Sequence, residues 1–158
     1  MGIKSEAEVA VLEAFLGVCP DFQEKTTTVK SCDPPEPDCL VSCVDGSATF
    51  FELRRIAHPG MEQKINDKKT PIDKKGGFGP DDDLIAECVK DKIEKSESYK
   101  TNGLDLDLVL YFDLLQLLLL PRGVIDHHVN AVIAKYGKGF FRKIWVFALH
   151  EKQIIGCF

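Results

Sequence analysis

Apolar residues recur along this chain with two different periods, and the two periods predict alternating helices and strands. Val9, Leu12 and Phe15 follow one another at helical spacing, whereas short runs rich in β-branched and aromatic residues between turn residues indicate strands. Helical patterns cover residues 5–18, 81–96 and 124–136. Strand patterns cover residues 26–30, 38–44, 48–56, 106–112, 143–149 and 153–158.

The order of these elements is helix, three strands, helix, strand, helix, strand, strand, which predicts an α/β sandwich with a mixed sheet flanked by helices. The length of 158 residues suits a single domain, and 44% hydrophobic residues are enough to form its core. Residues 57–79 contain several prolines and glycines without a sustained period, so we expect a long loop there. Residues 114–120 predict a short helix or a buried linker.

The stretch 38–54 has the signature of a β-hairpin, because two short apolar runs flank an Asp45-Gly46 turn. Two kinds of turn fit this dipeptide. Residues 44–46 can form a three-residue loop with Gly46 in the left-handed conformation, which pairs residue 43 with residue 47. Alternatively, Asp45-Gly46 alone can form a type I′ turn, which shifts the pairing by one residue. We favour the three-residue loop, and a bulge could restore the same parity.

This turn decides whether three charged side chains share a face, because cross-strand neighbours point to the same side of a sheet. The favoured loop places Asp38 directly opposite Glu52, with Arg54 on the same face. The two-residue turn sends the two acids to opposite faces. Two carboxylates on one face form a site for a hard divalent cation such as Mg²⁺ or Mn²⁺.

The element order, with Pro37-Asp38 on one arm of the hairpin and Glu52-Leu-Arg54 on the next, resembles the PD-(D/E)XK nuclease superfamily. The restriction-endonuclease-like core of that family runs helix, three strands, helix, strand. The resemblance covers about residues 5–113, and residues 114–158 would add a C-terminal helix and a β-hairpin. Arg54 stands where the family has a lysine, which is a departure from its pattern.

The resemblance implies a metal-dependent nuclease that hydrolyses nucleic-acid phosphodiester bonds. Asp38 and Glu52 would hold Mg²⁺ or Mn²⁺, and Glu6 or Glu13 would supply the further acid that the family often takes from a helix. Arg54 would complete the catalytic set.

The arginine at position 54 changes what this set can do. Its guanidinium keeps the positive charge and can clamp a phosphate with two donors. An arginine side chain keeps its proton in proteins, so it cannot act as a base. Lys64 and Lys90 are alternatives for the place of the family's lysine, and the sequence does not place either of them.

The net charge of −5 argues against a nonspecific nucleic-acid coat protein but leaves room for local basic surfaces. The 57–79 loop has an excess of two positive charges, and residues 121–158 have six basic and two acidic residues. If the chain is a nuclease, we expect the loop to contact a nucleic-acid backbone, DNA in the first place, although a lysine-rich loop is more often simply solvated. We expect no membrane partner, and a homodimer is left open. The lysines of the loop are Lys64, Lys68, Lys69, Lys74 and Lys75.

The sequence leaves two other functions open. The chain can be a non-catalytic module on the same scaffold that binds nucleic acid or protein, with Glu52 and Arg54 as a surface ion pair. It can also be a small-molecule enzyme whose site uses Asp105, Asp107 or Asp113.

The six cysteines form no C-x-x-C pair, so a structural zinc site is not favoured. We expect reduced cysteines and a cytoplasmic protein. No apolar run follows a basic N-terminal start, and we therefore expect no signal peptide. The leucine-rich run 114–120 is too short to span a bilayer.

Overall fold

The structure is a computed structural model that describes residues 3–56, 82–112 and 122–158. The predicted 57–79 loop and 114–120 linker lie outside these residues. Within them, the predicted order of helices and strands is confirmed. The elements are α1 (Ile3–Leu16), β1 (Thr26–Ser31), β2 (Cys39–Cys43), β3 (Ala48–Arg55), α3 (Asp82–Lys95), the 3₁₀ helix η1 (Ser96–Ser98), β4 (Asp105–Phe112), α5 (Arg122–Tyr136), β5 (Lys143–Ala148) and β6 (Gln153–Cys157).

One mixed sheet holds all six of these strands, in the order β1-β2-β3-β4-β5-β6. Strands β1, β2 and β3 form an antiparallel meander, β3, β4 and β5 are parallel, and β6 returns antiparallel to β5. Because parallel neighbours need a crossover connection, α3 lies between β3 and β4 in the chain, and α5 lies between β4 and β5. The α/β class with a mixed sheet is therefore as predicted.

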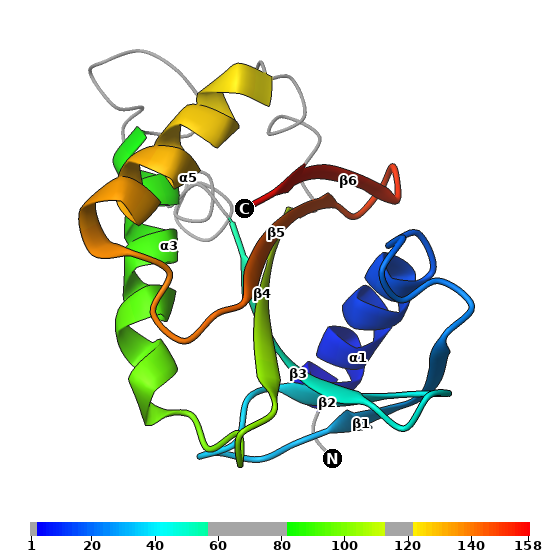
Figure 1. Ribbon diagram of the computed structural model, residues 1–158. Coiled ribbons are helices and arrows are strands. Elements are labelled where there is room, and N and C mark those ends of the chain that lie inside the picture. Colours follow the sequence, from blue (N-terminus) through cyan, green and yellow to red (C-terminus); the bar gives the residue numbers. More distant parts are fainter. Residues whose placement is uncertain (1–2, 57–81, 113–121) are drawn as a thin grey trace.

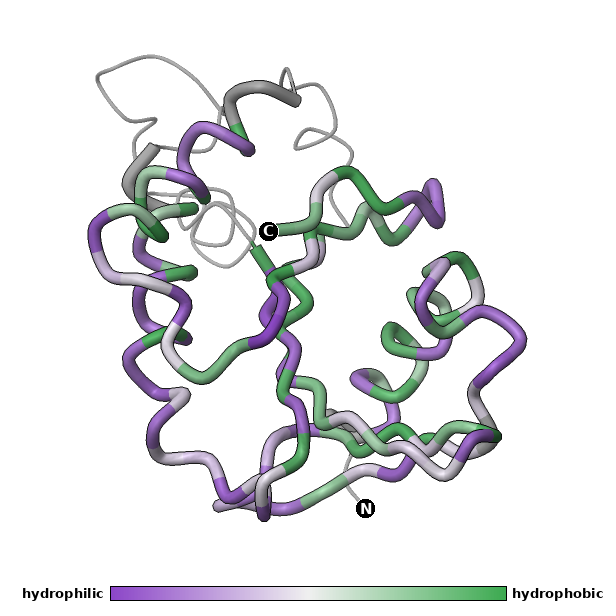
Figure 2. The backbone as a smooth tube through the Cα atoms, in the orientation of Figure 1, coloured by the Kyte–Doolittle hydropathy of each residue, from purple (hydrophilic) through white to green (hydrophobic). Residues whose placement is uncertain are grey.

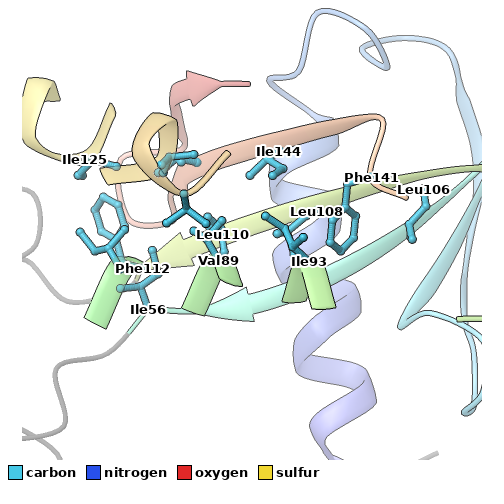
Figure 3. Close-up of a cluster of buried hydrophobic side chains, with 14 of the residues drawn as sticks. Ile56, Val89, Ile93, Leu106, Leu108, Leu110, Phe112, Ile125, Phe141 and Ile144 are labelled. Atoms are coloured by element: carbon cyan, nitrogen blue, oxygen red, sulfur yellow. The ribbon is translucent and has the colours of Figure 1, made fainter. Parts of the chain in front are cut away.

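The helices cover both faces of the sheet, with α3 and α5 on one face and α1 on the other (Figure 1). Because side chains alternate along β4, this strand contributes residues to the hydrophobic clusters on both faces of the sheet. Leu106, Leu108 and Leu110 pack toward α3 and α5, as Figure 3 shows, whereas Val109 belongs to the cluster built with α1. Strand β4 is thus buried on both sides, as expected of an interior strand.

The N-terminal helix differs in its bounds from the predicted 5–18. It runs from Ile3 to Leu16 and so ends two residues before the predicted end. No glycine or proline separates Ile3 from Ser5, and the helix therefore extends two residues further toward the N-terminus. Its apolar side, which includes the fully buried Leu12 and Phe15, packs on the sheet.

Helices α3 and α5 pack against each other, and both alternate hydrophilic and hydrophobic residues along their length, as surface helices do (Figure 2). Strands β5 and β6 continue the same sheet beyond β4. The C-terminal residues therefore share the core of the rest of the chain. Among the described helices, none has the length and apolar character needed to cross a membrane.

Candidate functional site

The β2–β3 hairpin has the register that the sequence favoured. Cys39 pairs with Phe51 and Ser42 with Ala48, and Cys43 N donates to Ser47 O at 2.9 Å. Gly46 has a φ of 88°, which is the left-handed conformation that glycine adopts without strain. The Asp45 carboxylate secures the turn by accepting hydrogen bonds from the backbone N–H and hydroxyl of Ser47 at 2.9 and 2.6 Å.

Continued by one step, this register places Asp38 opposite Glu52, immediately before β2 begins. The Asp38 Oδ2 atom accepts a hydrogen bond from Leu53 N at 2.9 Å, which fixes the aspartate against β3. Glu52 lies in the middle of β3 and is only 3% exposed. Its neighbours Phe51 and Leu53 belong to the α1 cluster, whereas Phe50 packs toward α3 and α5. The Glu52 side chain therefore points to the α3 face.

Two further polar side chains approach Glu52 from the α3 region. Lys92, in the last turn of α3, places its Nζ 3.3 Å from Glu52 Oε1, and both side chains are largely buried. Tyr99, just after η1, lies close enough for its hydroxyl to hydrogen-bond with the Glu52 carboxyl group. The loop that carries Tyr99 is tied to the loop before Asp38, because Lys100 N donates to Pro35 O at 2.9 Å.

The surroundings of Glu52 favour its neutral form. Burial, followed by the hydrogen bond and the negative charge of Asp38, raises the pKa of Glu52 to about 8, against the opposing effects of Lys92 and the Tyr99 hydroxyl. Burial and the Glu52 charge in turn raise the pKa of Tyr99. Two carboxyl groups that share one buried position need a proton or another positive charge between them.

One oxygen of this group lacks a donor. In the carboxylate form, the buried Glu52 Oε2 accepts no hydrogen bond from any described residue, whereas the protonated form can hydrogen-bond to Asp38. A buried polar atom without a partner is costly, and such an atom is one observation expected where a ligand binds. The donor chemistry suits a hard cation, because carboxylate oxygens are the ligands that Mg²⁺ and Mn²⁺ prefer. Asp38 and Glu52 are thus the described residues that fit a divalent metal.

The other expected site residues lie elsewhere. By strand parity Arg54 shares the face of Glu52, but its side chain is exposed near the end of β3. Glu6 and Glu13 are exposed on α1, which packs against the opposite face of the sheet, so the structure does not bring them to Glu52. Within the described residues, no group of three or more His, Cys, Asp or Glu side chains is arranged to hold a metal ion.

The expected basic residues divide between two parts of the chain. Lys64, Lys68, Lys69, Lys74 and Lys75, proposed for nucleic-acid binding, lie outside the described residues. Lys90 lies on α3, where its Nζ is 3.9 Å from the Glu94 carboxylate and 5.2 Å from the centre of the Tyr136 ring. It is therefore Lys92, and not Lys90, that reaches Glu52.

Sequence reasoning missed Lys92 and Tyr99. A signal for Lys92 was present, because it lies three residues after Val89 and seven after Ile85, on the stripe that buries α3. A lysine on a buried stripe needs a partner of opposite charge. Tyr99 gave no such signal, since it follows the helix in a segment without a period.

A second buried carboxylate, Asp107, lies on β4 and points to the α1 face. It is fully buried and accepts two hydrogen bonds from Arg142, at 3.0 and 2.8 Å, and one from Trp145 Nε1 at 3.0 Å. These donors occupy both of its oxygens. The role that the structure supports for Asp107 is to join β4 to β5. Asp113, named with it as a candidate for a small-molecule site, lies outside the described residues.

Comparison of the chain with protein-family models, with curated proteins and with solved structures gave no match.

Proposed function

We propose that this protein is a metal-dependent nuclease of the PD-(D/E)XK type, in which Asp38 and Glu52 hold Mg²⁺ or Mn²⁺. The observation that carries the proposal is that Asp38, immediately before β2, lies beside Glu52 in the middle of β3, with Lys92 Nζ 3.3 Å from Glu52 Oε1. The order helix, three strands, helix, strand around them agrees with the restriction-endonuclease-like core.

Two carboxylates are enough for this kind of metal site. Mg²⁺ keeps several of its waters and is commonly bound through one or two carboxylates together with substrate phosphates. The partnerless Glu52 Oε2 and the carboxylate of Asp38 are the oxygen atoms available for it. When bound, the metal supplies charge for the phosphodiester and lowers the pKa of a bound water.

The positive side chain of the site comes from α3 in this proposal. The family pattern expects a lysine two residues after the second acid, where this chain has the exposed Arg54. Lys92 supplies an ammonium group at Glu52 from a different element, and its side chain is 15% exposed. We assign to Lys92 the positioning of the attacking water and the offset of phosphate charge, and to Arg54 a contact with the nucleic-acid backbone.

A non-catalytic module on the same scaffold is the second candidate. The observation that favours it is the burial of both partners of the Glu52–Lys92 pair, with side chains 5% and 15% exposed. A buried polar contact of this kind fixes the rotation and register of α3 on the sheet without any catalytic role. In that case the protein binds nucleic acid or another protein and does not cleave.

Cleavage of nucleic acid by the purified chain tests the first candidate. We expect plasmid or single-stranded DNA to be cut in Mg²⁺ or Mn²⁺, and cutting to fall by at least about 100-fold in Asp38→Asn and in Glu52→Gln. Asp33→Asn is the matched control, because Asp33 is an exposed acid in the same loop as Asp38. RNA of the same sequence is included as a second substrate.

Metal binding is measured separately, by calorimetry and by the shift of the unfolding temperature on adding Mn²⁺. We expect binding to the wild type and to Asp33→Asn, and none to Asp38→Asn. Binding without cleavage of any nucleic acid would favour the non-catalytic module. Unaltered cleavage or metal binding in Asp38→Asn would overturn the proposed site.

A further inference from the structure

A pocket of about 350 Å³ lies between the segment that follows α3 and the loop that joins α5 to β5. Tyr99, Leu104 and Phe140 provide its apolar walls, and Glu97 and Thr101 provide polar groups. Tyr99 belongs both to this pocket and to the surroundings of Glu52. Tyr99 therefore connects the pocket to the surroundings of Glu52.

Two exposed apolar side chains line the pocket. Phe140 is 65% exposed and Leu104 is 39% exposed, and they are two of the four large hydrophobic residues exposed among the described residues. The other two, Val44 and Tyr136, lie elsewhere on the molecule. Exposed apolar side chains that line one hollow mark a ligand site more often than side chains scattered singly.

Hydrogen bonds and a close backbone contact hold the loop that carries Phe140 in place. The buried Ser96 hydroxyl accepts a hydrogen bond from Phe140 N at 3.0 Å and donates one to Ile93 O at 2.6 Å. Gly139 has a φ of 60°, and a Cβ there would collide with Ser96 Oγ and lie 2.9 Å from Ile93 O. Only glycine allows this close approach, which holds the Phe140 backbone against η1 before any ligand binds.

We propose that this pocket receives one unpaired nucleobase of the substrate, stacked on Phe140, while the adjoining phosphate lies at Asp38 and Glu52. The volume of about 350 Å³ is ample for a purine, and an exposed aromatic ring is the surface on which single-stranded bases stack. Glu97 and Thr101 provide hydrogen-bonding groups for the base edge. The inference rests on the proposed function and deepens it, because it names single-stranded nucleic acid as the substrate class.

Binding of a short single-stranded oligonucleotide carrying one 2-aminopurine tests the pocket without any cleavage. The fluorescence of this base is quenched by stacking, and the titrations are made in EDTA. We expect Phe140→Ala to weaken binding about 5- to 150-fold, which is the effect of losing one base–aromatic stack, and to abolish the quenching. Phe140→Tyr should retain both properties, because its ring can still stack.

Two controls separate stacking from general effects. Val44→Ala removes a 66% exposed apolar side chain in the β2–β3 turn and should leave binding unchanged. An oligonucleotide with an abasic position in place of the 2-aminopurine should bind the wild type and Phe140→Ala equally. Equal binding of the intact oligonucleotide to wild type and Phe140→Ala would overturn the inference.

The cleavage and binding experiments together distinguish a failure of the pocket proposal from a failure of the proposed function. If metal-dependent cleavage is lost in Glu52→Gln but unchanged in Phe140→Ala, the nuclease proposal stands and the pocket proposal is rejected. Quenching that depends on Phe140, without cleavage in any metal, would retain the pocket on a non-catalytic protein. If neither DNA nor RNA oligonucleotides bind, both proposals fail, and the pocket is then better explained as a site for a protein side chain.

Discussion

Two buried carboxylates on neighbouring strands have opposite surroundings. Asp107 of β4 points to the α1 face and accepts three hydrogen bonds from Arg142 and Trp145. Glu52 of β3 points to the α3 face, where one of its oxygens is 3.3 Å from Lys92 and the other has no partner among the described residues. Both are almost completely buried, with 0% and 3% of their surface exposed.

The difference in hydrogen bonding distinguishes Asp107, which stabilises the fold, from Glu52, which is available to bind a ligand. A buried charge is tolerated when its hydrogen bonds are complete, and Asp107 meets that condition. Glu52 does not meet it, and its pKa is raised to about 8 by burial and by Asp38. We therefore expect Asp107 to be needed for stability, and Glu52 to reduce the stability of the metal-free protein at neutral pH.

A large loss of stability is expected on removing Asp107. Asp107→Ala leaves the buried Trp145 N–H without an acceptor and Arg142 without its countercharge, and should lower the free energy of unfolding by about 3 kcal/mol. Chemical denaturation followed by Trp145 fluorescence measures it. A loss below about 1 kcal/mol would show that water replaces the carboxylate, and the contrast with Glu52 would then disappear.

A pH-dependent effect is expected at Glu52. Because its folded-state pKa is raised from 4.5 to about 8, the folded protein binds a proton more tightly than the unfolded chain. Stability from this group is present at low pH and is lost as the pH rises through about 8. Relative to Glu52→Gln, the wild type in EDTA should lose about 2–4 kcal/mol between pH 5 and pH 8.5. A constant difference between the two proteins across this range would contradict the raised pKa.

Replacing Lys92 tests whether this lysine completes the site at Glu52. Lys92→Ala should lower the cleavage rate by about 100-fold, because a positive charge near the phosphate is lost, while Mn²⁺ binding is retained. Lys90→Ala is the matched control, since Lys90 lies on the same helix but is 40% exposed and faces Glu94. The assignment fails if the two variants cleave equally well.

The smallest effect is expected at Arg54. Its exposed side chain lies on the face of Glu52 near the end of β3, so Arg54→Ala should change the free energy of unfolding by less than about 0.5 kcal/mol. Its effect on cleavage should be a rise in KM of about fivefold or less that vanishes at high salt, as for a single backbone phosphate contact. A fall in kcat as large as that of Lys92→Ala would instead place Arg54 among the catalytic residues.

The sequence by itself determined the order of elements, and it limited the register of the hairpin to two alternatives, of which it favoured the one observed. Both follow from local rules, since helix and strand periods are read within a few residues and the Asp45-Gly46 turn sets the parity of Asp38 and Glu52. The facing of these two acids was therefore the favoured of two local alternatives, and the conformation of Gly46 decided between them.

Only the tertiary structure decided which other groups meet each carboxylate. Lys92 reaches Glu52 across 40 positions of chain, and Arg142 reaches Asp107 across 35. Such contacts depend on how far α3 is rotated about its axis and on which strands become neighbours, and packing of the whole sheet fixes both. For the same reason, the position two residues after Glu52, where the family has a lysine, holds the exposed Arg54. The buried positive charge comes instead from Lys92 of α3.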